Sequence, residues 1–250
     1  MGAGASDPEH RILAVWHANA QAWSRAVREG RIASRRLVTD AAVIAAVLAR
    51  APRRVIDIGC GEGWLVRELV GQGIDALGVD AVPTLVEAAR DAGAGRYATM
   101  DYAGITAGDL REQADLVVCN FSLFGGPSVE GLLAALPRLL VQGGTLVIQT
   151  LHPWSACGEA DYRDGWRAGS WAGCGDGFGE AAPWYFRTLA GWQRTFLAAG
   201  LRVLEVAEPL HPETGRPASI LFTLAVAGPA VPARPPRQAA ARATPRDPSA

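Results

Sequence analysis

The sequence contains no lysine: all 24 of its basic residues are arginine. This absence excludes enzymes that form a Schiff base through a lysine amine, including those that anchor pyridoxal phosphate in that way. It also excludes the phosphate-binding loop that requires Gly-Lys-Ser/Thr. Several large classes of enzyme are therefore ruled out before any motif is considered.

Cysteine is scarce as well, with four residues in 250, which is too few for a disulfide scaffold. Cys60 and Cys119 lie in apolar, strand-like contexts, and we expect both to be small core residues. Cys157 and Cys174 lie in a glycine-rich stretch, and their spacing matches no zinc pattern. We therefore expect no metal site.

Long hydrophobic runs and an excess of one charge are also absent. The longest apolar run, residues 41–49, is far too short to cross a bilayer, and the N-terminus lacks the basic-then-apolar layout of a secretory signal. The net charge is −1, and no basic stripe marks a nucleic-acid module. These features predict a soluble, cytoplasmic protein with neither a membrane nor a nucleic-acid partner.

The residues that are present alternate between short β-branched runs and helical stretches. Residues 10–50 are expected to form two helices that are separated at Gly30. Strands are expected at 54–58, 74–79, 96–100, 115–119 and 145–151, with helices at 62–70, 84–91, 107–113 and 128–140. This alternation predicts βαβ crossovers and therefore an α/β fold with a mostly parallel, doubly wound sheet.

The alternation stops after the fifth strand. Residues 152–186 hold many Gly, Trp and Tyr without a clear period, and we interpret them as a cap. A helix is expected at 187–199, followed by strands at 201–208 and 218–227. The link between these two strands is too short for a crossover helix, so they should be antiparallel.

Three regions follow from this organisation. Residues 1–50 are interpreted as an N-terminal helical lid and residues 51–227 as the main domain. Residues 228–250 are rich in Pro, Ala and Arg and nearly free of large apolar residues. Such a segment cannot bury enough surface to fold, so we expect a disordered tail.

A glycine-rich string at the first strand-to-helix turn is the main functional signal. It reads Val-Ile-Asp57-Ile-Gly59-Cys-Gly61-Glu-Gly63-Trp. Glycines in this position let backbone approach a ligand closely, and the helix N-terminus offers free N–H groups. Asp80 ends the second strand, where a carboxylate can bind both ribose hydroxyls of a nucleoside. The alternative is a tight turn with an aspartate that only caps a helix.

The type of nucleoside follows from the details of the string. A dinucleotide-binding fingerprint requires Gly where Trp64 stands, and the short-chain dehydrogenases also need a catalytic lysine, so a nicotinamide-dependent dehydrogenase is disfavoured. The string instead resembles motif I of the class I S-adenosylmethionine-dependent methyltransferases of the small-molecule type. The resemblance extends over about residues 35–227, including the turn at residues 142–148 before the fifth strand. It implies S-adenosylmethionine as the cofactor and a seven-stranded sheet in the order 3-2-1-4-5-7-6, with the last strand antiparallel.

The resemblance also assigns cofactor-binding roles. It places Asp80 at the ribose, Asp101 and Tyr102 at the adenine, and Asn120 at the methionine end of the cofactor. Asp57 lies where it could meet the amino group. For each, a purely structural role remains open: a solvated strand-end acid for Asp57, a helix cap for Asp101, packing for Tyr102 and a turn for Asn120.

The cofactor carboxylate needs a cationic partner. Related methyltransferases often supply an arginine just before the first strand, and Arg35 and Arg36 stand there in this sequence. An arginine fork suits a carboxylate. The alternative is that both are solvated arginines on a helix surface.

The substrate side is predicted from the aromatic cap. Five of the eight tryptophans lie in residues 154–192, at the sheet edge where ligands bind in open α/β sheets. Trp154, Trp184 and Tyr185 are expected to contact an aromatic or otherwise flat small molecule; a satellite core is the alternative. Arg187 either binds an acidic substrate group or pairs with an acid such as Glu208.

His152, directly after the fifth strand, is the candidate general base, because histidine titrates near neutrality. A structural histidine that bonds neighbouring backbone is the alternative. The predicted activity is methyl transfer from S-adenosylmethionine to an oxygen or nitrogen of a small molecule. The alternative function is a catalytically inactive S-adenosylmethionine-binding partner or sensor. The oligomeric state stays open.

Overall fold

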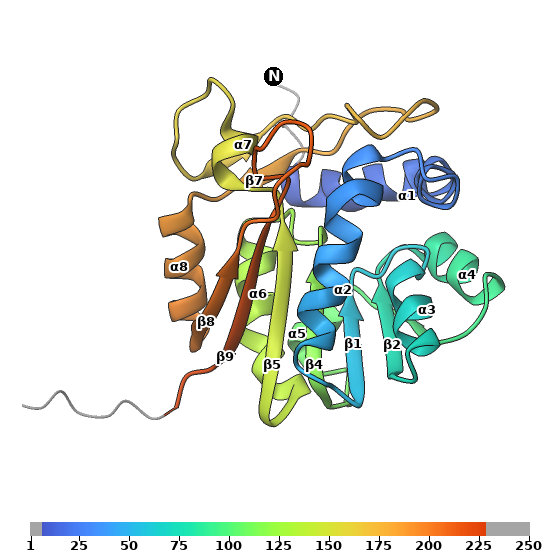
Figure 1. Ribbon diagram of the computed structural model, residues 1–250, viewed down its shortest axis with the longest axis vertical. Coiled ribbons are helices and arrows are strands. Elements are labelled where there is room, and N and C mark those ends of the chain that lie inside the picture. Colours follow the sequence, from blue (N-terminus) through green and yellow to red (C-terminus); the bar gives the residue numbers. More distant parts are fainter. Residues whose placement is uncertain (1–6, 229–250) are drawn as a thin grey trace, which may run out of the picture.

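The computed structural model describes residues 7–228, so residues 229–250 of the predicted tail lie outside the described residues. A seven-stranded sheet forms the centre of the molecule (Figure 1). Its strands are β1 (Arg54–Ile58), β2 (Asp75–Asp80), β3 (Arg96–Thr99), β4 (Ala114–Asn120), β5 (Leu140–Thr150), β8 (Leu201–Ala207) and β9 (Ile220–Val226). The helices are α1 (Pro8–Arg28), α2 (Asp40–Leu48), α3 (Trp64–Gly71), α4 (Pro83–Asp91), α5 (Tyr102–Ala107), α6 (Pro127–Ala135), α7 (Pro153–Cys157) and α8 (Leu189–Ala198).

The strand order is β3-β2-β1-β4-β5-β9-β8. The first five strands pair in parallel, whereas β9 is antiparallel to both β5 and β8. With β8 and β9 counted as the sixth and seventh strands, this is the predicted order 3-2-1-4-5-7-6. The predicted fold class is confirmed.

Two apolar layers cover the faces of the sheet. On one face, Ile56, Val117 and Ile148 of the strands pack with side chains of α5, α6 and α8. On the other face, Val55 and Leu116 pack with side chains of α2 and α3. Alternate strand residues thus point to opposite layers, as expected of a sheet that is buried on both faces. Cys60 and Cys119 are buried, as the sequence predicted.

Three helices differ from the sequence-based expectation. The one expected at 128–140 is α6, which ends at Ala135 and is followed by a 3₁₀ turn, Leu136–Leu139. The helix that was expected at 107–113 is α5, which begins at Tyr102 because Asp101 caps it and ends at Gly108, a residue in the left-handed conformation. The second N-terminal helix begins with a π-helical turn, Arg35–Thr39, that leads directly into α2.

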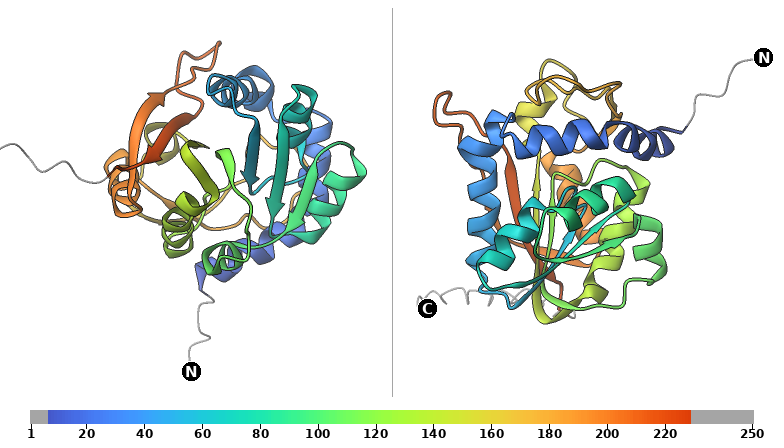
Figure 2. Two further views of the ribbon diagram at one scale, coloured as in Figure 1. Left: turned by 90° about the horizontal axis from the view of Figure 1, so that it is seen from below. Right: turned by 90° about the vertical axis from the view of Figure 1, so that its right-hand side faces the viewer.

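Helix α1 and the cap lie over the carboxyl ends of the parallel strands (Figure 2). The cap contains α7 and a short antiparallel hairpin of β6 (Gly165–Arg167) and β7 (Trp184–Phe186), which sequence analysis did not predict. The predicted lid is divided: α1 crosses the sheet edge, whereas Val43 and Val47 of α2 belong to the core. A role of α1 as a lid stays a prediction.

Candidate functional site

The turn between β1 and α3 brings three glycines to the carboxyl edge of the sheet. Gly59, Gly61 and Gly63 have φ values of +77°, +57° and +80°, in the left-handed region that favours glycine. A Cβ on Gly59 would overlap Ser122, and a Cβ on Gly61 would lie 3.3 Å from the indole nitrogen of Trp23. A Cβ on Gly63 would lie 2.8 Å from the Cβ of Ala89. All three glycines are therefore favoured both by backbone conformation and by close neighbours.

Asp80 stands at the end of β2, beside this turn. Its Oδ2 accepts a hydrogen bond from the backbone N–H of Gly61 at 2.8 Å, and its Oδ1 accepts one from Val82 at 2.9 Å. Burial raises the pKa of this carboxyl, and the backbone hydrogen bonds oppose the rise. Each oxygen keeps a second lone pair that could accept a hydroxyl. The structure thus brings Asp80 to the turn; its binding of ribose stays a prediction.

Asp57 and Asn120 end neighbouring strands and carry buried oxygen atoms without partners. Asp57 is 2% exposed, and neither its Oδ1 nor the Oδ1 of Asn120 has a hydrogen-bond partner among the described residues. Burial, and then the nearby charge of Asp80, raise the pKa of Asp57 to about 8. Buried polar atoms normally find partners, so these two oxygens fit a ligand that donates hydrogen bonds, such as the ammonium and hydroxyl groups of S-adenosylmethionine.

The two predicted adenine-binding residues have local structural contacts. Asp101 accepts a hydrogen bond from the backbone N–H of Gly104 at 2.8 Å, which is the helix-cap alternative. Tyr102 donates its hydroxyl to the carbonyl of Ser122 at 2.7 Å, and burial raises the pKa of this phenol. Both residues lie near the carboxyl edge, and their contact with an adenine stays a prediction.

Arg35 and Arg36, the two candidate partners of the cofactor carboxylate, have different surroundings in the structure. The side chain of Arg35 is 11% exposed and pairs with Asp40 at 3.0 Å. Its guanidinium lies 4.5 Å from the ring centre of Trp64, the first residue of α3 after the glycine turn. Arg36 is exposed, and its stem lies beside Gly30 instead. Arg35 is therefore the better placed of the two for a cofactor carboxylate.

An aromatic cluster joins α1 to the cap above the glycine turn. Trp16 packs edge-on against both Trp23 and Trp171, and it stacks on Phe124 after β4. Trp171 stacks on Phe178 of the cap with ring centres 4.4 Å apart. Trp16 and Trp23 fall within the helix that the sequence predicts before Gly30, but sequence analysis missed this placement. The period identifies the apolar face of a helix but not what that face covers.

His152 has partners on both ring nitrogens. Its Nδ1 accepts a hydrogen bond from the backbone N–H of Trp154 at 3.2 Å, and its Nε2 lies 2.7 Å from Oε1 of Glu208. The ring is 5% exposed and caps α7. These contacts assign the proton to Nε2. They leave no nitrogen free to take a proton from a substrate, so they favour the structural interpretation over the predicted general base.

We expect His152→Ala to lower the melting temperature by several degrees, because it removes a buried ring, a helix cap and the partner of Glu208. Thermal denaturation at neutral pH measures this effect, with Glu208→Gln as the milder companion variant. A large fall in kcat at unchanged melting temperature would instead identify His152 as the base.

Arg187 is also engaged by the protein itself. Its guanidinium donates to the carbonyls of Gly125 and Gly126, both at 2.8 Å. Its nearest carboxylate is Glu130, at 3.8 Å, and desolvation by burial lowers the pKa of Arg187. The expected pair of Arg187 with Glu208 does not form, because Glu208 contacts His152. Arg187 holds the loop after β4 in place.

The remaining predicted substrate residues differ in position. Trp154 is 74% exposed. Trp184 and Tyr185 lie on β7 and line a narrow cavity together with Phe124 and Thr150. The cavity lies at the carboxyl ends of β4 and β5, and both β7 and Pro153 at the start of α7 border it.

Within residues 7–228, no cluster of three or more His, Cys, Asp or Glu side chains could hold a metal ion. None of the helices in this part of the chain is long and apolar enough to span a membrane.

A family model described as a methyltransferase domain matches residues 29–206 of the chain. This range includes the glycine turn, Asp57, Asp80 and Asn120. The chain belongs to this methyltransferase family. The methyltransferase identity and the cofactor S-adenosylmethionine, both predicted from the sequence, are confirmed at the level of the family.

Two curated methyltransferases illustrate the similarity. Trans-aconitate 2-methyltransferase from Rhodococcus jostii is 34% identical over 126 residues, which are 49% of this chain and 47% of that protein. A ubiquinone biosynthesis O-methyltransferase from Methylococcus capsulatus is 34% identical over 106 residues, 41% of this chain and 45% of that protein. The matches thus span about half the length of these methyltransferases.

Solved structures agree on the fold. The methyltransferase resembles 1,6-didemethyltoxoflavin-N1-methyltransferase from Burkholderia thailandensis with a TM-score of 0.63 at 19% identity, over 91% of this chain and 94% of that chain. It resembles an S-adenosylmethionine-dependent methyltransferase from Clostridium acetobutylicum with a TM-score of 0.57 at 13% identity, over 83% and 92% of the two chains.

Proposed function

We propose that this methyltransferase transfers a methyl group from S-adenosylmethionine to an oxygen or nitrogen atom of a small molecule. The observation that carries the proposal is the pair of buried, unpartnered oxygens on Asp57 and Asn120 beside the glycine turn. A ligand that brings both an ammonium group and hydroxyl groups to one sheet edge would satisfy them.

Each end of the cofactor would meet residues of a different strand end. The ammonium group would lie at Asp57 and the ribose at Asp80, with the adenine toward Asp101. Arg35 would face the carboxylate, since its side chain is largely buried and lies beside Trp64 at the turn. Helix α1 would then cover the cofactor, because Trp16 and Trp23 already lie over the same edge.

The acceptor class is supported by the neighbouring proteins and by the cap. The two curated relatives are a trans-aconitate methyltransferase and an O-methyltransferase of ubiquinone biosynthesis, and both names denote small acceptors. Trp184, Tyr185 and Phe124 line the cavity beyond β4 and β5. These aromatic side chains favour a planar, apolar acceptor bound beside the cavity, whose own volume of about 10 Å³ fits no more than a water molecule.

When bound, S-adenosylmethionine supplies an activated methyl group on a good leaving group. The protein would contribute in-line positioning and exclusion of water. Arg187 fixes the loop at Gly125 and Gly126, and α1 and the cap shield the strand ends. His152 would hold the start of α7 through its contacts with Trp154 and Glu208.

The alternative, an inactive protein that binds the cofactor as a partner or sensor, gains no support from the comparisons. Mass spectrometry distinguishes it from the enzyme: a panel of phenol, amine and carboxylate acceptors should yield S-adenosylhomocysteine and a product 14 mass units heavier, whereas a sensor would bind both cofactor forms and form no product.

We expect Asp80→Ala to weaken S-adenosylmethionine binding about 10- to 150-fold, which corresponds to roughly 1.5–3 kcal/mol for hydrogen bonds to a charged group. Isothermal titration measures the change. Asp75→Ala is the matched control. Asp75 begins the same strand and pairs with Arg96, so it lies at the amino end of the strand, away from the candidate site. Equal affinities in the two variants would remove Asp80 from the cofactor site.

A further inference from the structure

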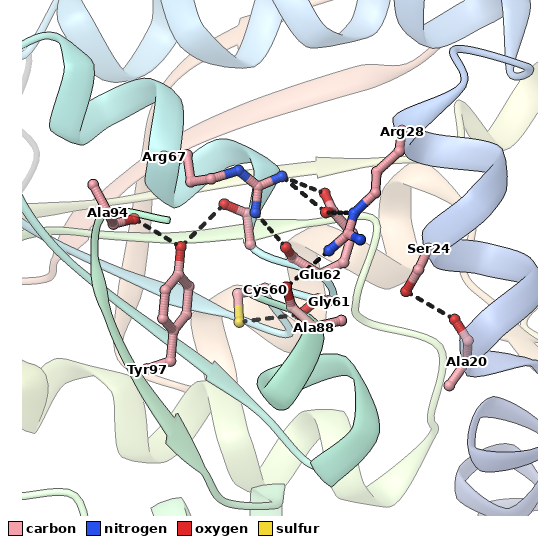
Figure 3. Close-up of polar contacts among 11 residues, drawn as sticks. Ala20, Ser24, Arg28, Cys60, Gly61, Glu62, Arg67, Ala88, Ala94 and Tyr97 are labelled. Carbon is pink, nitrogen blue, oxygen red and sulfur yellow. Dashed lines mark hydrogen bonds and ion pairs between the residues drawn. The ribbon is translucent and has the colours of Figure 1, made fainter. Parts of the chain in front are cut away.

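Glu62 stands between two of the turn glycines, and its side chain is fully buried. Arg67 of α3 donates to both carboxylate oxygens, at 2.8 and 3.0 Å. Arg28 donates its Nε to Oε2 at 3.1 Å (Figure 3). A single buried carboxylate thus holds two guanidinium groups from different helices.

The two arginines differ in what they connect. Arg67 lies five residues after Glu62 and also donates to its backbone carbonyl, so it closes the turn on itself. Arg28 is the last residue of α1, and its Nη2 donates to the carbonyl of Ala88 in α4 at 2.8 Å. Since Arg67 already contacts both oxygens of Glu62, neutralisation of the carboxylate does not require Arg28. What Arg28 adds is a connection between α1, α4 and the glycine turn.

The position of α1 over the site depends on where its last turn is held. From Arg28 the helix runs back across the sheet edge, with Trp23 over Gly61 and Ala20 packed against Val82 after β2. At its other end, Glu9 accepts a hydrogen bond from the backbone N–H of Gly126 at 2.8 Å. The helix is therefore attached at both ends to loops that follow strands of the site.

We infer that Arg28 is a positioning residue that acts through Glu62: their ion pair holds α1 over the bound cofactor and sets how long the cofactor stays. This inference rests on the proposed function for the identity of the cofactor. The pair fixes the last turn of α1 to the glycine turn, and release of a covered ligand requires the covering element to move, so loss of the pair should act mainly on the dissociation rate. Arg28 contacts no predicted cofactor-binding side chain, so its effect is transmitted by α1.

The test compares Arg28→Ala with Arg25→Ala in stopped-flow release of S-adenosylhomocysteine. Arg25 lies one turn earlier on the same exposed side of α1, and its side chain makes no hydrogen bond or ion pair among residues 7–228. We expect Arg28→Ala to release the ligand about tenfold faster with little change in melting temperature, and Arg25→Ala to match the wild type. Arg28→Lys keeps the charge without the fork and should recover part of the loss.

Two further measurements make the result decisive. In the ligand-free protein, Arg28→Ala should speed amide hydrogen exchange along α1, a readout that does not depend on the cofactor. In a Glu62→Gln background, Arg28→Ala should add little to the release rate, because the partner charge is already gone. Equal release by Arg28→Ala and Arg25→Ala, or additive effects in the double variant, would overturn the inference. Wild-type protein that binds no S-adenosylhomocysteine would refute the proposed function, and exchange along α1 would still decide the role of Arg28.

Discussion

Asp57→Asn should stabilise the ligand-free protein increasingly from pH 4 to about pH 8 and should weaken cofactor binding at the same time. In the folded protein, burial and the charge of Asp80 raise the pKa of Asp57 from 3.8 to about 8. The unfolded chain therefore loses this proton near pH 4, whereas the folded chain keeps it until about pH 8. Asp57 thus makes the protein progressively less stable as pH rises from 4 to 8, with a slope approaching roughly 1.4 kcal/mol per pH unit.

Asparagine removes this penalty, because it carries no charge in either state. Thermal denaturation of the wild type and Asp57→Asn between pH 4 and 9 should show curves that coincide at pH 4 and separate progressively up to about pH 8. Asp115→Asn is a control for which the opposite effect is expected. Hydrogen bonds from the backbone N–H groups of Arg54 and Arg53 lower the pKa of Asp115. Loss of this carboxylate should therefore destabilise the protein at neutral pH. A lower melting temperature of Asp57→Asn at pH 8 would show that the carboxylate has an unrecognised partner.

The same substitution removes the charge that would face the cofactor ammonium group. Loss of one partner from a buried charge pair costs about 3–5 kcal/mol, so affinity should fall by about 100-fold or more. Wild-type affinity should rise with pH up to about 8, because the carboxyl must release its proton before it can pair, and the asparagine variant should lack this rise. Titration at several pH values measures both effects.

The fold could be predicted because its signals are local. The change from short β-branched runs to a helical period marks the strands and helices of the sheet, and the glycine string marks the turn after β1. Parallel strands that alternate with helices leave few possible topologies. Even so, α5 was placed too late in the chain, because the side chain of Asp101 begins that helix earlier than its apolar pattern indicates.

The relative position of candidate site residues could be predicted only where they lie at the ends of neighbouring strands. Asp57 and Asp80 lie at the ends of strands that pair directly, so their arrangement follows from the sheet. His152 and Arg187 meet partners 56 and 61–62 residues away, and no periodicity connects them. Histidine and arginine are residue types that often bind substrates. In this structure, however, Arg187 contacts the loop after β4 and His152 contacts the segment after β5.

The largest structural effect is expected for Gly59→Ala. The residue has φ +77°, and its position faces Ser122, whose Oγ donates to the carbonyl of Ile58 at 2.7 Å. The carbonyl of Ser122 in turn accepts the hydroxyl of Tyr102 at 2.7 Å. Because Ser122 is held on both sides, it cannot move aside for a methyl group. A steric overlap is therefore added to the backbone strain.

Gly73→Ala separates these two contributions. Gly73 has φ +82°, but nothing lies within 4 Å of the position that its Cβ would take. It should lose only about 1 kcal/mol from backbone strain, which lowers the melting temperature by about 2–4 °C in a chain of this size. Gly59→Ala should lose about 3 kcal/mol or more and should fail to bind S-adenosylmethionine at measurable affinity.

Ser122→Gly supplies the complementary change. If the overlap causes the additional loss, the double variant Gly59→Ala/Ser122→Gly should be more stable than the sum of the two single effects predicts, since the second change empties the space that the methyl group needs. Urea denaturation of the four proteins measures this coupling. Additive losses, or equal losses in Gly59→Ala and Gly73→Ala, would mean that the turn requires glycine for its backbone conformation alone and that Ser122 yields to a side chain.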